Sequence, residues 1–321
     1  MELSLPGNVM GHPMPDRIGC FDIGGTKIAA GIIDSSGRIL AERETPTRTE
    51  TGPQDAVLRM AAMMGECLQE AGGPLQGVGI GCTGPVDPQT GEIGNVEFLQ
   101  TWQGFGLASA LAEALDAAVF LENDADAAAL AEWRWGAGRG SRSVVLVTIG
   151  TGIGAGIIID RQLYRGVGGS HPEIGHMILD PSGPACYYGG RGCWEELASG
   201  PALESWAQLQ HPLGQRLSAR ELCGLARSGD AAGLAAIQRE AYYLGLGLAN
   251  LVMVFTPDVI GLGGGLMAQY DLFQQGIQQT VRELCGAVPF EQVQILPAQL
   301  GVRAGLVGAG AAALQRMGLN I

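Results

Sequence analysis

The sequence predicts an α/β protein with two domains, each built on a mixed sheet, and a functional site in the cleft between them. Two glycine-rich segments, 21–34 and 147–160, align without a gap and are identical at six positions, which indicates a duplicated unit. Apolar segments of strand length alternate with segments of helical spacing along most of the chain. With 321 residues, 46% of them hydrophobic, the chain is long enough for two cores.

The composition limits the class of partner. Lys and Arg total 19 against 32 Asp and Glu, a net charge of −13, and no basic cluster occurs, so we expect no nucleic-acid partner. Seven scattered cysteines fit a reducing cytoplasm. The most apolar window, 144–159, is too short to span a membrane, and no membrane is implied. Residues 1–17, with three prolines, are expected to form a flexible N-terminal tail.

Both glycine-rich segments predict a strand, a glycine turn and a second strand, followed by a polar turn and a third strand with antiparallel pairing. Apolar periodicity predicts the other strands at 75–81, 119–122 and 293–297, and 259–266 is predicted to be a strand that runs into a triple-glycine turn. It predicts helices at 53–71, 107–115, 200–206, 219–226, 231–254, 269–286 and 305–317, and an Ala-rich helix that ends near Gly136. We expect a small domain at 18–120 plus 304–321, a large domain at 121–303, and hinges near 118–122 and 302–305.

The glycine turns suit phosphate binding, because glycine lets the backbone approach an oxyanion closely and direct several N–H groups at it. One such turn alone is more simply explained as a hairpin closure. Two copies facing each other across a cleft could hold one polyphosphate from both sides. A dinucleotide fingerprint at 150–154 or 261–265 is excluded, because that motif must open a helix and be followed by an acidic residue about 20 positions later.

Polar side chains follow the strand at 119–122, where the Ala-rich helix begins. Asn123 or Asp124 could simply cap this helix, since both residue types are favoured there. A cap needs one such group, and Asn123, Asp124 and Asp126 together exceed that need. The positive end of the helix would stabilise an ionised Asp124.

The segment 171–196 concentrates residue types that bind ligands. His176, Cys186 and Cys193 are the imidazole and thiol groups that zinc prefers, but a closed structural site requires four ligands. Tyr187, Tyr188 and His171 are the nearby candidates for the fourth position. The alternative is that the two cysteines pack in the core and that His176 is a hydrogen-bonded core histidine.

The same segment resembles the ROK family of sugar kinases and repressors. E-x-G-H at 173–176, then D-P-x-G-P-x-C, G-x-x-G-C-x-E and A-S-G-P-A-L are similar to its signature. Members usually carry C-x-C-G-x-x-G-C, whereas here Tyr188 stands at the place of the second Cys. D-I-G-G-T-K at 22–27 and T-I-G-T-G-I-G-A-G at 148–156 resemble the two-domain actin-like ATPase (ribonuclease H-like) fold, and the resemblance covers nearly the whole chain from residue 18.

The resemblance implies an ATP-dependent hexose kinase with Asp124 as general base, and a homodimer. Asp22 would order the shell of Mg²⁺, and any Zn²⁺ would be structural, held by His176, Cys186 and Cys193. The residues implied in sugar binding are Gly84, Asn95, Asn123, Asp124, Glu173, His176 and Glu195. Those implied in ATP binding are Asp22, Gly24, Gly25, Thr26, Lys27, Thr148, Gly150, Thr151, Gly152, Gly263, Gly264 and Gly265.

The resemblance leaves the sugar open. D-P-S-G-P-A-C and the spacing of Cys186 and Cys193 are more similar to glucokinases, so glucose is our first expectation. His171-Pro172 is more similar to fructokinases, and 95–99 departs from the glucokinase pattern, so fructose and N-acetylglucosamine or N-acetylmannosamine stay alternatives. A sugar-sensing regulator is a further alternative. It would need a DNA-binding module ahead of the first glycine turn, where only 21 residues precede Asp22.

Overall fold

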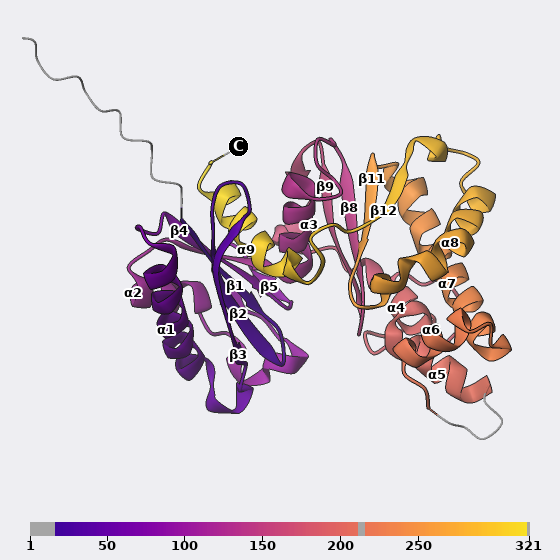
Figure 1. Ribbon diagram of the computed structural model, residues 1–321, viewed down its shortest axis with the longest axis horizontal. Helices are drawn as coiled ribbons and strands as arrows, with labels where there is room; N and C mark the ends of the chain where they lie inside the picture. Colours follow the sequence, from indigo (N-terminus) through magenta and orange to yellow (C-terminus); the bar gives the residue numbers. More distant parts are fainter. Residues whose placement is uncertain (1–16, 211–215, 320–321) are drawn as a thin grey trace, which may run out of the picture.

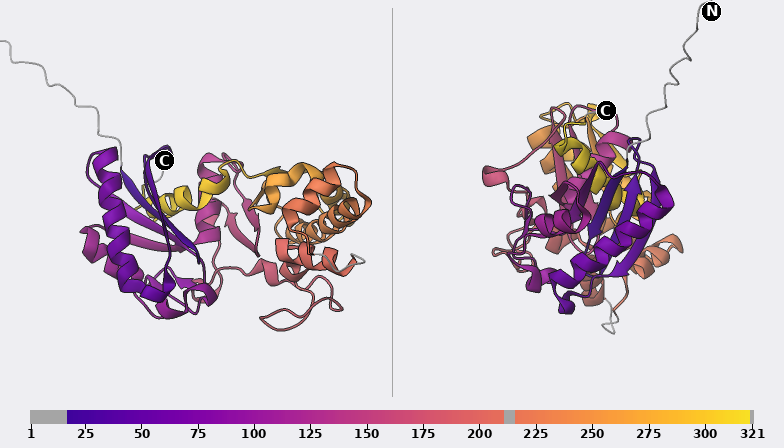
Figure 2. Two further views of the ribbon diagram at one scale, coloured as in Figure 1. Left: turned by 60° about the horizontal axis from the view of Figure 1, so that its bottom comes forward. Right: turned by 90° about the vertical axis from the view of Figure 1, so that its left-hand side faces the viewer.

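The computed structural model describes residues 17–210 and 216–319, so residues 1–16 of the predicted tail lie outside the described part. The chain forms two five-stranded mixed sheets with helices α3 and α9 between them (Figure 1). Each sheet has further helices on its outer face, so the layers alternate between helix and sheet across the molecule (Figure 2). No helix within the described ranges is long and apolar enough to cross a membrane.

The first sheet has the strand order β3-β2-β1-β4-β7, antiparallel from β3 to β1 and parallel from β1 to β7. Its strands are β1 (Ile18–Ile23), β2 (Lys27–Ile33), β3 (Ile39–Pro46), β4 (Gly77–Cys82) and β7 (Val119–Asn123). Apolar side chains alternate along β1, with Ile18 and Cys20 packed toward α9 and Phe21 and Ile23 packed toward α1. Both faces of the sheet are therefore buried.

The second sheet repeats this arrangement with the order β10-β9-β8-β11-β12 and the same strand directions. Its strands are β8 (Val144–Ile149), β9 (Ile153–Ile159), β10 (Gln162–Leu163), β11 (Val259–Gly263) and β12 (Gln294–Pro297). Both sheets start with a hairpin at the predicted glycine turn, so the duplication inferred from 21–34 and 147–160 extends to the whole sheet. Within the predicted strand and glycine turn at 259–266, the strand ends at Gly263 and the turn begins with the left-handed backbone of Gly264.

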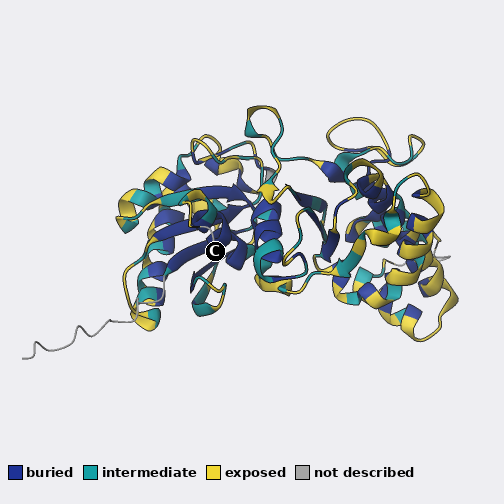
Figure 3. Ribbon diagram, turned by 90° about the horizontal axis from the view of Figure 1, so that it is seen from above, coloured by how far each residue is buried: buried dark blue, intermediate teal, exposed yellow. Residues whose placement is uncertain are grey.

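The outer helices supply the two main cores, which are the buried regions of Figure 3. On the first sheet these are α1 (Pro53–Ala71) and α2 (Leu107–Leu115), both with the predicted bounds. On the second sheet they are α4 (Trp194–Ala198), α5 (Gly200–Gln210), α6 (Ala219–Arg227), α7 (Ala231–Phe255) and α8 (Tyr270–Leu284). The connections also contain a short ribbon, β5 (Val86–Asp87) with β6 (Glu92–Ile93).

The inner helices α3 (Asp124–Trp135) and α9 (Ala304–Arg316) approach each other closely because α3 is rich in Ala and α9 is rich in Ala and Gly. A Cβ atom at Gly308 would lie 2.2 Å from the carbonyl oxygen of Ala127. A Cβ atom at Gly79 would lie 1.7 Å from the carbonyl oxygen of Ala309, so α9 rests directly on β4. Small residues thus allow one pair of helices to contact both sheets.

The predicted domain boundary needs one correction. All residues of β7, from Val119 to Asn123, pair with β4 in the first sheet, so a division between 120 and 121 or a hinge at 118–122 would cut this strand. We propose that the division lies after Asn123, where α3 begins. The second connection between the two domains would lie at the short helix Gly301–Arg303, just before α9 returns to β1 and β4.

Candidate active site

A cleft of about 1140 Å³ lies at the carboxyl ends of β4 and β7 and beside the β8–β9 turn. Such ends are where ligand loops gather in open α/β sheets. Its lining combines side chains from both halves of the chain. The predicted site residues that line it are Gly84, Asn95, Asn123, Asp124, Thr148, Gly150, Thr151, Gly152, Glu173, His176, Glu195 and Gly264.

Asp124 is the first residue of α3 and faces this cleft. Its Oδ1 accepts the backbone N–H of Ala125 at 2.8 Å. Burial raises the pKa of Asp124 above its usual value, and the Ala125 N–H opposes that shift by stabilising the carboxylate. A carboxylate with a raised pKa beside a cleft has the properties of a general base.

Asn123 caps the amino-terminal end of α3. Its side-chain Oδ1 accepts the backbone N–H groups of Ala125 and Asp126, at 2.9 and 3.2 Å. The amide nitrogen Nδ2 lies on the side of Gly84, where a Cβ atom would approach it to 2.8 Å. Capping therefore leaves the Asn123 amide group in the cleft lining and leaves Asp124 free for chemistry.

Behind Asp124 lies an ionic cluster that the sequence analysis did not predict. Arg165 donates through one terminal nitrogen to Asp126 and through the other to Glu122, and His171 Nδ1 lies 2.7 Å from Asp126 Oδ2. His171 therefore pairs with Asp126 and is not part of the proposed zinc site. One sequence signal was present, because Arg165 is the only Lys or Arg between 162 and 190.

Two further carboxylates line the cleft from the second half of the chain. Glu195, in α4, accepts the backbone N–H of Ile153 through Oε2 at 2.8 Å. A Cβ atom at Gly152 would lie 2.3 Å from that oxygen, so this glycine is needed for the contact. Glu173 is exposed at the cleft, just before Gly175, where a Cβ atom would lie 2.0 Å from the Ile153 carbonyl oxygen. The Glu195 carboxylate and the backbone that follows Glu173 thus both contact the start of β9.

A second cleft, of about 570 Å³, adjoins the first and shares Gly150 and Thr151 with it. Gly265, predicted at the adenosine, lines this second cleft, whereas Gly264 lines the first. Of the predicted ATP residues, the ones that line neither of these two clefts are Asp22, Gly24, Gly25, Thr26, Lys27 and Gly263.

The first glycine turn, at residues 24–27, lies next to the first cleft. A Cβ atom at Gly25 would lie 2.7 Å from Cβ of Phe98, a residue that lines the first cleft. Lys27 forms an exposed ion pair with Glu44 at 2.7 Å. Asp22 lies beside Gly305 at the start of α9, where a Cβ atom would approach Asp22 Oδ2 to 2.4 Å. Burial, and then the charge of Asp124, raise the pKa of Asp22 to about 6.

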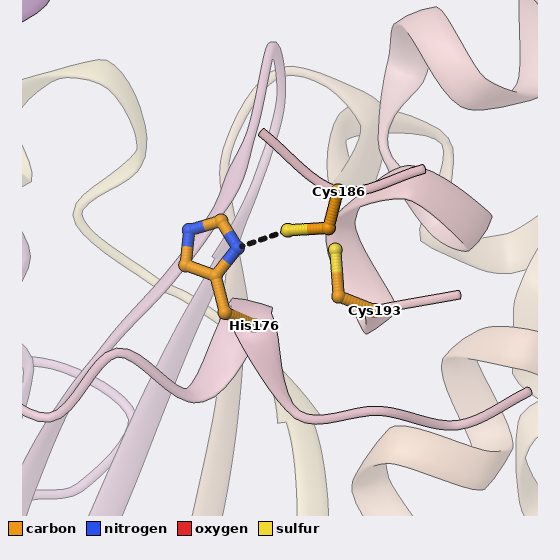
Figure 4. A group of neighbouring side chains, drawn as sticks. All are labelled: His176, Cys186 and Cys193. Carbon is orange, nitrogen blue, oxygen red and sulfur yellow. Dashed lines mark hydrogen bonds between the residues drawn. The ribbon is translucent and has the colours of Figure 1, made fainter. Parts of the chain in front are cut away.

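His176, Cys186 and Cys193 converge as predicted (Figure 4). Their ligand atoms all lie within 4.8 Å of one another, and Cys186 Sγ is 3.5 Å from His176 Nδ1. Zinc bound at about 2.0–2.3 Å places neighbouring tetrahedral ligands roughly 3.5–4 Å apart, so the donor set fits the ion. Among the described residues no fourth His, Cys or carboxylate joins the group.

Tyr187 and Tyr188 pack around His176. The ring centroids lie 5.2 and 4.5 Å from the imidazole, both edge-on, and the two tyrosine rings are 4.5 Å apart. The hydroxyl of Tyr187 is 3.4 Å from His176 Nε2. Aromatic contacts therefore stabilise the loop around His176.

Comparison with known proteins identifies relatives over nearly the whole chain. Residues 18–316 match the model of the ROK family. A glucokinase from Streptomyces coelicolor is 35% identical over 304 residues, which are 90% of this chain and 94% of that protein. The structure of a ROK hexokinase from Thermus thermophilus has a TM-score of 0.83 and 35% identity, over 95% of this chain and 100% of that one. The structure of a ROK glucokinase from Streptomyces griseus, in complex with glucose and AMPPNP, has a TM-score of 0.78 and 34% identity, over 93% of this chain and 99% of that one.

Relatives with other functions match as well. An N-acetylmannosamine kinase from Haemophilus influenzae is 31% identical over 90% of this chain and 92% of its own length. A xylose repressor from Bacillus subtilis is 30% identical over 73% of this chain and 60% of its own length. The family model covers more than nine-tenths of the described residues. The chain therefore belongs to the ROK family and has its two-domain actin-like ATPase fold.

Proposed function

We propose that this ATP-dependent sugar kinase phosphorylates glucose to glucose 6-phosphate, with Asp124 as the general base. The observation that carries the proposal is the position of Asp124, a half-buried carboxylate with a raised pKa in the cleft that the β8–β9 glycine turn also lines. A sugar hydroxyl is a poor nucleophile, so its transfer reaction needs a carboxylate to accept the proton. Asp124 has no competing capping role, because Asn123 caps α3.

The sugar would lie among the polar side chains of the first cleft. Glu173, Glu195 and His176 can accept hydrogen bonds from hydroxyl groups, and Asn123 can donate through its amide. Asn95 and the backbone at Gly84 would complete the contacts from the first half of the chain. Several fixed polar partners around one polyol are how a site distinguishes one sugar from another.

ATP would extend from the first cleft into the second. The backbone N–H groups at 150–152 and the hydroxyl groups of Thr148 and Thr151 would hold phosphate oxygens, and 263–265 would contact the adenosine. Residues 24–27 would contact the phosphates from the opposite side. Asp22 would order water on the Mg²⁺ that accompanies ATP. These first-half residues would reach the nucleotide only when the two halves close on it.

We also infer a structural zinc ion at His176, Cys186 and Cys193. Bound zinc would supply a fixed cross-link between the E-x-G-H segment and the start of α4. That cross-link would hold Glu173 and Glu195 at the two ends of the loop in a constant relation to each other. With Tyr188 at the place of a cysteine, we expect weaker binding than at a site with three Cys and one His.

The substrate is tested by an ADP-release assay of the purified protein with glucose, fructose, mannose, N-acetylglucosamine and N-acetylmannosamine. We expect the highest kcat/KM with glucose, in line with the relatives from Streptomyces. A preference for an N-acetylhexosamine would instead agree with the relative from Haemophilus influenzae, and would overturn the assignment to glucose. Sugar binding without ADP release for every sugar would favour a sugar-sensing regulator.

A further inference from the structure

The ionic cluster behind Asp124 carries an inference that rests on the proposed sugar kinase function. Asp126 is completely buried, and its Oδ2 receives both Arg165 and His171. Arg165 also contacts Glu122, which is almost fully buried. The four side chains connect β7 and α3 to the segment that follows β10 and leads to Glu173.

Burial raises the pKa of Glu122, and the charge of Arg165 opposes that shift. With Glu122 and Asp126 both ionised, the charges of this cluster balance when His171 is protonated. Glu122 and Asp126 carry two negative charges, and Arg165 supplies one positive charge. An unbalanced buried charge is strongly unfavourable, so a second cation is needed. Burial and the charge of Arg165 lower the pKa of His171. The hydrogen bond and charge interaction with Asp126, with a contribution from Glu173, outweigh both effects, so the pKa is raised overall. Asp124 is the other ionisable group that interacts with this imidazole.

A protonated His171 has two N–H donors, one of which is already used. Nδ1 donates to Asp126 at 2.7 Å. The side chain lines the first cleft, and none of the hydrogen bonds found among the described residues involves Nε2. The cleft therefore contains a charged N–H donor that interacts with Asp124 and Glu173, which are acceptors when ionised.

We propose that His171 is a specificity-determining residue, whose Nε2–H donates a hydrogen bond to an oxygen of the bound hexose near the reacting hydroxyl. Asp126 and Arg165 act through it as positioning residues. The carboxylates of the cleft can only accept hydrogen bonds from the sugar, so the oxygen that His171 contacts is recognised through its lone pairs. A hydrogen bond from a charged donor is also stronger than a neutral one.

A panel of monodeoxy and deoxyfluoro derivatives of the preferred hexose tests the proposal, because fluorine can accept a weak hydrogen bond and cannot donate one. At the position that His171 contacts, we expect the deoxy sugar to bind the wild-type protein about 10- to 100-fold more weakly than the parent sugar. The fluoro sugar should bind with an intermediate affinity. In His171→Ala the deoxy and parent sugars should differ at that position by less than about threefold. If removing each hydroxyl group weakens sugar binding equally in the wild type and in His171→Ala, the proposal is overturned.

The role of Asp126 is tested by NMR titration of the imidazole groups, which is practical because the chain has four histidines. In Asp126→Asn the pKa of His171 should fall, and sugar affinity should fall with it while the KM for ATP stays unchanged. In the Asp126→Asn background, adding His171→Ala should weaken sugar binding by less than it does in the wild type, since the two groups act as one unit. Additive losses, or an unchanged His171 pKa, would contradict this part.

Two controls separate the possible failures. His171→Gln retains an N–H donor without the charge, so it should recover part of the affinity for the parent sugar. If His171→Ala fails to fold, the same comparison is made with His171→Gln. In that variant the deoxy sugar should lose less affinity relative to the parent sugar than it does in the wild type. Sugar affinity is measured by calorimetry, separately from ADP release. Wild-type protein that binds hexose without turnover would refute the kinase function and still allow the test of His171.

Discussion

Burial raises the pKa values of two aspartates near the cleft, and the other groups around each of them act in opposite directions. Asp124 is held at the start of α3, where a backbone N–H opposes the effect of burial. Asp22 lies beside the start of α9, and the charge of Asp124 adds to the effect of its burial. A buried carboxylate with a raised pKa can accept a proton in a reaction, but its ionised form destabilises the folded state.

Asp124→Asn should retain sugar and ATP binding and reduce kcat by about 10²- to 10⁴-fold, because a positioned base contributes that much. In the wild type, the base must be ionised, so kcat/KM should fall as the pH decreases through the raised pKa of Asp124. Steady-state kinetics and calorimetry measure both effects. Turnover of Asp124→Asn within about tenfold of the wild type would exclude Asp124 as the base.

Asp22→Asn should stabilise the protein and reduce its activity. The pKa of Asp22 is about 6 when folded, against 3.8 for the free side chain, so stability is lost as the pH rises through this range. Removing the charge should therefore raise the free energy of unfolding by about 1–3 kcal/mol at pH 8 and by less at pH 5. Denaturant titration at the two pH values measures this difference. An equal effect at both would show that ionisation of Asp22 is not the cause.

At the scale of elements, glycines allow loops and helices to meet at the site. Gly152 lets Glu195 reach the N–H of Ile153, and Gly175 lets the E-x-G-H segment rest on the same residue. The β8–β9 turn therefore contacts both Glu195 and the E-x-G-H segment, which we propose to bind sugar, while its own backbone is proposed to bind phosphate. A change in this turn should affect both substrates.

Gly152→Ala should raise the KM for sugar and for ATP by about tenfold or more, because the added Cβ would lie 2.3 Å from Glu195 Oε2 and would force the two groups apart. Gly65→Ala is a matched control, since Gly65 lies in α1 and a Cβ atom there meets no atom within 4 Å. The control should keep both KM values and gain about 0.5–1 kcal/mol of stability. Unchanged KM values in Gly152→Ala would contradict the role of this contact.

Cys193→Ser should remove zinc from the protein and weaken sugar binding, because the ion would be left with two protein ligands. Elemental analysis of protein purified without chelator should give about one equivalent of zinc in the wild type and a small fraction of this in the variant. Cys67→Ser, a buried cysteine in α1, is the control and should retain the zinc. Zinc-free wild-type protein with full activity would show that the tyrosine packing around His176 is sufficient.

At the scale of the whole molecule, the two hairpins that resemble each other do not line the same cleft. The β8–β9 turn lines the cleft with Asp124, whereas residues 24–27 lie beyond Phe98. The inner pair, α3 and α9, contacts both sheets, so a rotation about this pair would change the distance between the turns. The homodimer and the cytoplasmic location stay predictions, and sedimentation analysis tests the first of them.

Glucose together with a non-hydrolysable ATP analogue should close the molecule, because both glycine turns must reach one polyphosphate. Small-angle X-ray scattering should show a smaller radius of gyration with both ligands than without them. Asp124→Asn should close in the same way, since it keeps both binding sites. An unchanged radius of gyration in protein saturated with both ligands would contradict the proposed contacts of residues 24–27.

The sequence by itself determined the elements and the family. Helix bounds such as Pro53–Ala71 and Leu107–Leu115 follow from local apolar periodicity, which depends on neighbours in the chain. The duplicated glycine turns and the E-x-G-H segment are also local patterns, and they predicted the cleft residues around Asp124. Even the group of His176, Cys186 and Cys193 spans only 18 residues.

Tertiary structure decided what depends on residues far apart in sequence. Asp126 meets Arg165 and His171 across 39 and 45 positions, and no periodicity indicates that pairing. The close contact of α3 with α9 depends on where Gly308 falls against Ala127, which only the folded chain specifies. The division between the two domains depends in the same way on pairing with β4, which extends to Asn123 and is not visible in local spacing.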